Sequence, residues 1–141
     1  MTSCKILTAR AFYHRWAWYV HDYLTKPGSD FHCKLHSWLL GQSKPADDDG
    51  AIALVFRNGE PIGWARTERW RAYDTLEAFV LPEYRLTGVA SFAAAGLRTT
   101  APIAGNGGGV AVFHPTMQLV AARAGLHPTL FRRRGDSWVL A

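Results

Sequence analysis

The chain has 141 residues, a formal net charge of +5 and a hydrophobic fraction of 48%. This length predicts one domain over residues 1–141, because two separate cores would each be marginal at this size. No apolar run reaches the ~20 residues of a membrane helix, and the first residues lack the apolar segment of a signal peptide. We therefore expect a cytoplasmic protein with no membrane partner, in which two cysteines are too few for a disulfide framework.

The N-terminal part predicts a strand followed by two helices. Residues 3–8 fit a short strand, and Thr8 is a suitable cap for a helix over residues 9–24, where aromatic residues recur at helical spacing. A second helix follows the turn at residues 26–29. On that helix His32 and His36 share a face, but no second ligand pair follows at zinc-like spacing, so we expect no metal site.

The middle of the chain predicts a hairpin and a mixed loop. Residues 51–56 and 62–67 are apolar runs joined by R-N-G-E-P, and Asn-Gly between such runs is a strong hairpin signal. Residues 68–73 then mix cations with aromatics. Such a loop could stack on a nucleotide or a ring-bearing substrate, or its Trp70 and Tyr73 could simply pack against the protein.

Residues 75–97 form a strand, a proline-marked turn, a short loop and an alanine-rich helix. A strand–loop–helix junction directs several backbone N–H groups and the positive end of a helix dipole at one point. That point is an anion site, and phosphate is the anion that such junctions commonly bind.

The C-terminal part predicts one more strand, a helix and a closing hairpin. Residues 110–113 read as a buried strand, which His114-Pro115 ends. A helix over residues 116–124 ends at Gly125, and residues 130–134 pair with residues 137–140 around a Gly-Asp turn.

The loop before the alanine-rich helix carries a family resemblance. Its residues R-L-T-G-V-A, from Arg85 to Ala90, follow the phrase V-L-P-E-Y-R and resemble the phosphate-binding signature of the GNAT superfamily of N-acetyltransferases. The order of predicted elements resembles that superfamily across nearly the whole chain. The resemblance implies an α/β (α+β) fold, in which a mixed, mostly antiparallel central sheet is flanked by helices after two N-terminal helices.

The same resemblance implies acetyl-CoA as the cosubstrate. The pyrophosphate of the donor would lie on the backbone N–H groups of residues 86–90, where Gly88 allows close approach, Arg85 adds charge and Thr87 or Ser91 adds a hydroxyl. Backbone groups of residues 79–81 would align the pantetheine as an added strand. The implied donor site comprises Phe79, Val80, Leu81, Arg85, Leu86, Thr87, Gly88, Val89, Ala90 and Ser91.

Glu77 is the leading candidate for the general base that takes the proton of the amine. Its phrase L-E-A-F-V-L-P-E-Y-R is similar to the L-E-D-x-x-V-x-P-E-Y-R-G phrase of the diamine acetyltransferases, offset by one residue. An acid in an apolar strand favours a role in a cleft. The alternative is that Glu77 pairs with a nearby arginine such as Arg66, and Asp74 is a weaker substitute for the base.

The general acid is less clearly marked. In the family a tyrosine on the last helix usually supplies this proton, and the corresponding position here is Ala121. His114 is the nearest alternative donor by position, although a histidine at a strand end can equally be structural.

The resemblance implies that the acceptor is a primary amine of a small molecule, a protein or a nucleic acid. An alternative is a nucleic-acid-directed acyltransferase that acts on aminoacyl-tRNA or a modified DNA base. The basic residues that favour it are Arg66, Arg69, Arg71, the run at residues 132–134, and the helix surface of Arg10, His14 and Arg15. These residues could equally form a solvated basic surface. A third hypothesis is a non-catalytic basic module that keeps the fold. We expect a monomer or a homodimer.

Overall fold

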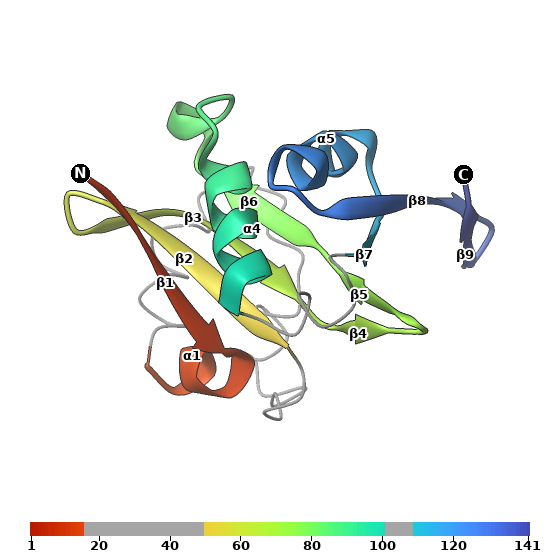
Figure 1. Cartoon of the computed structure of the whole chain (residues 1–141), viewed down its shortest axis with the longest axis horizontal. Helices are drawn as coiled ribbons and strands as arrows, with labels where there is room; N and C mark the ends of the chain where they lie inside the picture. The colour runs from red at the N-terminus through yellow and green to blue at the C-terminus, as the bar shows by residue number, and fades with distance from the viewer. Residues whose placement is uncertain (16–49, 101–108) are drawn as a thin grey trace.

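The computed structural model describes residues 1–15, 50–100 and 109–141. Its strands and helices follow one another as an α+β chain (Figure 1). The elements are β1 (Thr2–Thr8), α1 (Ala9–Arg15), β2 (Ala51–Arg57), β3 (Glu60–Thr67), β4 (Arg69–Trp70), β5 (Tyr73–Thr75), β6 (Glu77–Val80), a 3-10 turn (Pro82–Tyr84), α4 (Val89–Thr100), β7 (Gly109–Val112), α5 (Pro115–Arg123), β8 (His127–Arg134) and β9 (Ser137–Leu140).

The start of the chain confirms the predicted strand and helix cap. Strand β1 leads directly into α1, and the Thr8 hydroxyl accepts a hydrogen bond from the Ala11 amide at 3.1 Å. The rest of the predicted first helix, the second helix and the histidine pair at residues 32 and 36 lie outside the described residues.

The described strands form two sheets. The first is antiparallel in the order β1-β2-β3-β6, and the second has the order β4-β5-β7-β8-β9. Only the β5–β7 and β7–β8 pairs are parallel among the described strands. The predicted hairpin is confirmed, because Asn58 and Gly59 turn between β2 and β3 with φ of 53° and 82°, as an Asn-Gly turn requires.

One continuous segment, residues 73–80, belongs to both sheets. Its first part, β5, pairs with β7, and the last bond between them runs from the Leu76 amide to the Ala111 oxygen at 3.1 Å. Its second part, β6, pairs only with β3 among the described strands. The two sheets therefore diverge beyond Leu76.

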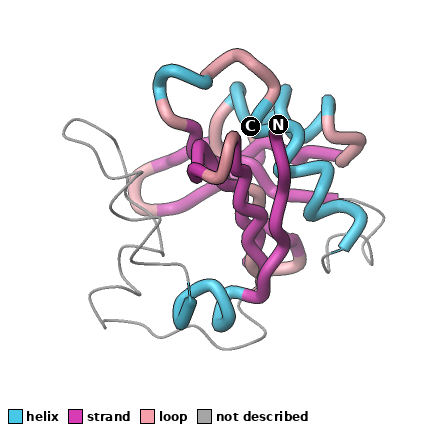
Figure 2. Tube along the Cα trace, turned by 90° about the vertical axis from the view of Figure 1, so that its left-hand side faces the viewer, coloured by secondary structure: helices cyan, strands magenta, loops and turns pink. Residues whose placement is uncertain are grey.

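Apolar side chains cover both faces of the first sheet. Along β2 alternate residues enter different cores, as the two-residue period of a strand dictates. One core lies against α4 and α5, and the other lies against α1, so α1 is on the opposite side of the strands from α4 (Figure 2). Helix α4, with Ala93, Ala94 and Leu97 fully buried, is thereby fixed against the sheet.

Two segments differ from the sequence-based expectation. Residues 68–73 were expected to form a loop, but they contribute the small hairpin β4–β5, because Arg69 and Trp70 pair with Asp74 and Tyr73. Strand β8 begins at His127 rather than residue 130, since parallel pairing with β7 extends it toward its start. No helix in the described part of the chain has the length and apolar character needed to cross a bilayer.

Candidate active site

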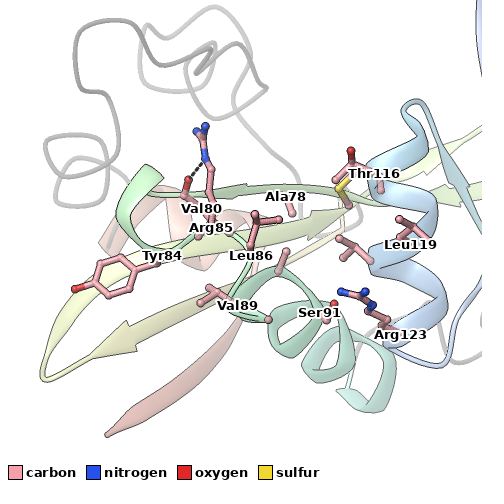
Figure 3. A pocket seen from close by; sticks show the side chains of 14 residues that line it. Ala78, Val80, Tyr84, Arg85, Leu86, Val89, Ser91, Thr116, Leu119 and Arg123 are labelled. Atoms are coloured by element: carbon pink, nitrogen blue, oxygen red, sulfur yellow. Dashed lines mark hydrogen bonds between the residues drawn. The ribbon is translucent and has the colours of Figure 1, made fainter.

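A cavity of about 360 Å³ occupies the space where the sheets diverge. Strand β6, the loop after it, the first turn of α4 and one face of α5 form its walls (Figure 3). The lining residues are Ala78, Val80, Tyr84, Arg85, Leu86, Gly88, Val89, Ala90, Ser91, Thr116, Met117, Leu119, Val120 and Arg123. Two of them are basic and none is acidic, so the cavity favours an anionic ligand with an apolar portion.

The loop at one end of the cavity has the geometry of an anion site. Leu86 and Gly88 both have left-handed backbone conformations, with φ of 63° and 86°. A leucine in this region costs about 1 kcal/mol, and such strain is retained mainly where a site requires it. The first helical bond of α4 runs from the Phe92 amide to the Gly88 oxygen at 2.9 Å. The amides of residues 89–91 therefore lack intrahelical acceptors and direct the positive end of the helix at the loop.

The edge of β6 supplies a second kind of contact. The Leu76 amide bonds to Ala111 on one side of the segment, and the Leu81 amide bonds to the Ile62 oxygen of β3 on the other, at 2.9 Å. Because backbone groups alternate between the two edges of a strand, those of Ala78 and Val80 face the cavity. An extended ligand can pair with this edge as an added strand.

The two arginines of the cavity are placed differently. Arg85 Nε donates to the Val80 oxygen at 2.9 Å, and its guanidinium carbon lies 5.6 Å from the centre of the Phe79 ring. It therefore braces the loop against β6. The guanidinium of Arg123, by contrast, extends from α5 toward the first turn of α4 next to Ser91 (Figure 3).

Solved structures share this architecture. Aminoglycoside N-acetyltransferase AAC(6')-Iy in complex with the bisubstrate analogue CoA-S-monomethyl-acetylneamine matches with a TM-score of 0.53 and 20% identity over 90% of this chain and 91% of that chain. The same enzyme in complex with CoA matches with a TM-score of 0.53 and 18% identity, over 90% and 88% of the two chains. Glucosamine-6-phosphate N-acetyltransferase from Arabidopsis thaliana matches with a TM-score of 0.51 and 13% identity, over 99% and 98%. The chain has the GNAT fold. No family model and no curated protein sequence matches it.

Within this GNAT fold, most of the predicted donor-site residues meet at the cavity. Those that line it are Val80, Arg85, Leu86, Gly88, Val89, Ala90 and Ser91. Three do not. Phe79 stacks on Trp64 on the opposite face of β6, Leu81 is buried in the core beside α1, and the Thr87 hydroxyl donates to the Tyr84 oxygen. Of the two hydroxyls considered, that of Ser91 is therefore the one at the cavity.

Sequence reasoning missed the wall that α5 provides. Thr116, Val120 and Arg123 recur at intervals of three and four residues, which places them on one face of the helix. That spacing was visible in the sequence and could have identified Arg123. Sequence reasoning also missed Ala78 as a lining residue. The two-residue alternation of a strand places Ala78 on the same face as Leu76.

Glu77 lies on the face of β6 opposite the cavity lining and forms an ion pair. Its Oε2 accepts hydrogen bonds from Arg66 Nε at 3.1 Å and Nη2 at 2.8 Å. The Arg66 side chain is 4% exposed and its Nη1 lies 3.4 Å from Glu68 Oε2, so this cation lies between two carboxylates. The predicted pairing of Glu77 with Arg66 is therefore confirmed, and the role of Glu77 as a base stays a prediction. Within the described residues its second oxygen, Oε1, forms no hydrogen bond, and the side chain is 37% exposed.

His114, the predicted acid, and Ala121, which stands where the family usually has a tyrosine, both have structural roles here. His114 caps α5, because its Nδ1 accepts a hydrogen bond from the Thr116 amide at 3.1 Å, and it does not line the cavity. Ala121 is fully buried in the core against α4. A tyrosine at that position of this chain would have to displace core side chains. Asp74 is buried and its Oδ1 lies 3.9 Å from Arg69 Nη1.

Proposed function

We propose that the protein is an N-acetyltransferase that transfers the acetyl group of acetyl-CoA to a primary amine. The observation that carries this proposal is the cavity in which the pairing edge of β6 meets the N-terminus of α4. Coenzyme A has a pyrophosphate at one end of an extended, amide-bearing arm. A helix N-terminus and a strand edge suit those two parts in turn. The CoA-containing neighbour of the same fold supports the assignment.

The donor is held by backbone and side-chain groups of the cavity. Amides of residues 86–90 and the hydroxyl of Ser91 bind its pyrophosphate. The positive charge comes from the guanidinium of Arg123, because Arg85 is hydrogen-bonded to the Val80 oxygen. The backbone of Ala78 pairs with the pantetheine arm. The amide of Val80, which faces the same edge, lies along the path of the thioester.

Acetyl transfer then requires one bond to form and one to break. The neutral amine nitrogen attacks the thioester carbonyl carbon, the carbon–sulfur bond breaks, and coenzyme A leaves as the thiolate. Because Glu77 lies on the face of β6 opposite the cavity lining, the amine approaches the thioester from that face. Glu77 accepts the proton that the amine loses, directly or through a water molecule, by its Oε1 while Arg66 holds Oε2. Because Ala121 is buried and His114 caps a helix, water supplies the proton to the thiolate.

Binding of coenzyme A provides the first test. Titration calorimetry with acetyl-CoA should show binding that Gly88→Ala weakens by about tenfold or more, because a methyl group blocks close approach of the phosphate. Gly59→Ala is the matched control. Both glycines have left-handed conformations, with φ of 86° and 82°, and an added methyl group meets nothing within 4 Å at either position. Equal effects of the two substitutions would refute the donor site.

Turnover provides the second test. Release of free thiol from acetyl-CoA in the presence of primary amines should fall about 10²- to 10⁴-fold in Glu77→Gln, the range for loss of a general base. Acetyl-CoA binding by the same variant shows that the protein is folded. Donor binding without turnover by any amine would favour the non-catalytic module, and unchanged turnover in Glu77→Gln would exclude this residue as the base.

A further inference from the structure

Two arginine-rich segments that are far apart in the sequence meet at one end of the molecule. The hairpins β4–β5 and β8–β9 lie at the end opposite β1 (Figure 1). We name the residues that they bring together the arginine–aromatic surface. Its rings are Trp70, Tyr73, Phe113, Phe131 and Trp138. Of its exposed cations, Arg71 and Arg133 lie over these rings, whereas Arg69, Arg132 and Arg134 alternate with ring-bearing residues and project from the opposite faces of β4 and β8.

The rings form one connected cluster across four strands and the residue after β7. The Phe131 ring is central, with its centroid 5.0 Å from that of Trp70, 5.3 Å from Tyr73 and 6.2 Å from Phe113. Trp138 extends the cluster, 4.8 Å from Phe113. Phe131 is buried, whereas the other four rings remain partly exposed. The cluster thus joins the two hairpins and presents aromatic surface to solvent.

Two arginines lie over these rings. The guanidinium carbon of Arg71 is 4.2 Å from the Trp70 ring centre and 6.0 Å from that of Phe131. Arg133 lies 6.0 Å from the Trp138 ring centre, and its Nε donates to the Gly135 oxygen at 3.1 Å, which leaves its Nη groups at the surface. A guanidinium stacked on an indole keeps its outer face available for another flat group.

Arg71 is held over Trp70 at a conformational cost. Its φ is 54°, in the left-handed region where a residue other than glycine is uncommon. The cost is about 1 kcal/mol, and the turn of β4–β5 could have avoided it with glycine. Strain of this kind is retained mainly where a ligand site requires it.

The surface has an excess of positive charge. Its carboxylates are Asp74, which is buried beside Arg69, and Asp136 in the turn of β8–β9. Within the described part of the chain, no carboxylate lies in ion-pair distance of Arg71 or of the arginines at residues 132–134. Arg66, by contrast, is buried between two glutamates and is not available to a partner.

We propose that the arginine–aromatic surface binds single-stranded nucleic acid. Unpaired arginines neutralise phosphates, and half-exposed rings with a stacked guanidinium provide flat faces for unpaired bases. An acidic peptide would use the charges but not the rings, and duplex DNA or RNA would keep its bases from them. None of the surface residues lines the cavity, so this inference goes beyond the proposed acetyl transfer and is tested separately.

Binding of a fluorescently labelled 12-nucleotide single strand, measured by anisotropy at several salt concentrations, tests the proposal. Five arginines against two aspartates leave about three phosphates to neutralise. The logarithm of the affinity should then fall against the logarithm of the salt concentration with a slope of about −2, or about 20-fold between 50 and 200 mM. Arg71→Gly and Arg133→Ala should each weaken binding by about tenfold and make the slope about 0.7 less steep.

The variants are matched to separate binding from folding and from total charge. Arg71→Gly removes the cation together with the left-handed strain, so the Tm should stay within a few degrees of the parent while binding falls. Lys5→Ala removes an exposed cation from β1, at the other end of the sheets, and should leave the affinity within about twofold. Acetyl-CoA binding should be unchanged in Arg71→Gly and Arg133→Ala.

Four results would overturn the proposal. They are a salt-independent affinity, an equal loss in Lys5→Ala, equal competition by a polyglutamate peptide, and tighter binding of a duplex of the same length. Loss of acetyl-CoA binding in Arg71→Gly would contradict the separation of the two sites. If the parent protein binds the single strand but not acetyl-CoA, the proposed acetyltransferase function is refuted, whereas nucleic-acid binding by the arginine–aromatic surface is supported.

Discussion

The ion pair between Arg66 and Glu77 predicts a large loss of stability when the glutamate is removed. Glu77→Ala leaves the Arg66 guanidinium, whose side chain is 4% exposed, with Glu68 at 3.4 Å as its remaining ion-pair partner. Breaking a buried pair from one side costs about 3–5 kcal/mol. We expect about 2–3 kcal/mol here, because Glu77 is 37% exposed and Glu68 retains part of the attraction.

Thermal unfolding measures this loss against a matched control. For a chain of this size, 2–3 kcal/mol corresponds to a decrease in Tm of about 6–12 °C. Glu60→Ala removes an exposed carboxylate from β3, the strand that carries Arg66, and should change the Tm by about 2 °C or less. If Glu77→Ala lowers the Tm no more than Glu60→Ala, the buried pair does not stabilise the fold as reasoned. Arg66→Met should cost less than Glu77→Ala, since it leaves no buried charge without its partner.

Three further substitutions test the packing, the first helix and the titration of a thiol. Leu97→Ala in α4, at a fully buried position, should destabilise by about 2–5 kcal/mol in urea unfolding, and a smaller loss would mean that the core collapses around the gap. Thr8→Ala should cost about 1 kcal/mol because it removes the acceptor for the Ala11 amide, whereas Thr8→Ser should retain it. Burial raises the pKa of the Cys4 thiol, so the native state binds its proton more tightly than the unfolded chain. The free energy of unfolding should therefore fall as the pH rises through the alkaline range, and by less in Cys4→Ala; equal pH profiles would contradict the burial effect.

The cavity wall formed by the loop and the first turn of α4 could be predicted because its local signals agree. The proline turn, the loop glycine and the alanine-rich helix all act within residues 82–97, and each is a short-range effect of backbone conformation. Gly88 indeed has a left-handed φ of 86°. Local signals did not predict which strand residues face the cavity. Phe79 and Leu81 face away from the cavity because register with β3 fixes which edge is free.

The sequence could not decide between the two interpretations of Glu77, because the answer depends on tertiary contacts. Arg66 was predicted as a possible partner and lies opposite Glu77 in the β3–β6 ladder, but only the register distinguishes it from the other arginines. In the sequence, residues 68–73 look like a loop because charged residues alternate with the aromatic ones. Packing of Trp70 and Tyr73 on Phe131 nevertheless stabilises a hairpin there. The expectation that these two rings pack is confirmed, although their partner lies some 60 residues away in the sequence.

The pairing of β1 with β2 has a consequence for the order of folding. Thr8 is opposite Ala51, so this pair closes a loop of about 40 residues, whereas β2 and β3 are joined by a two-residue turn. Loop-closure entropy must be lost before a distant pair contributes any stability. We therefore expect β2, β3 and β6 to be structured in the transition state and β1 to join afterwards. Substitutions at Ile6 should then mainly accelerate unfolding, while those at Leu54 and Ile62 should mainly slow folding.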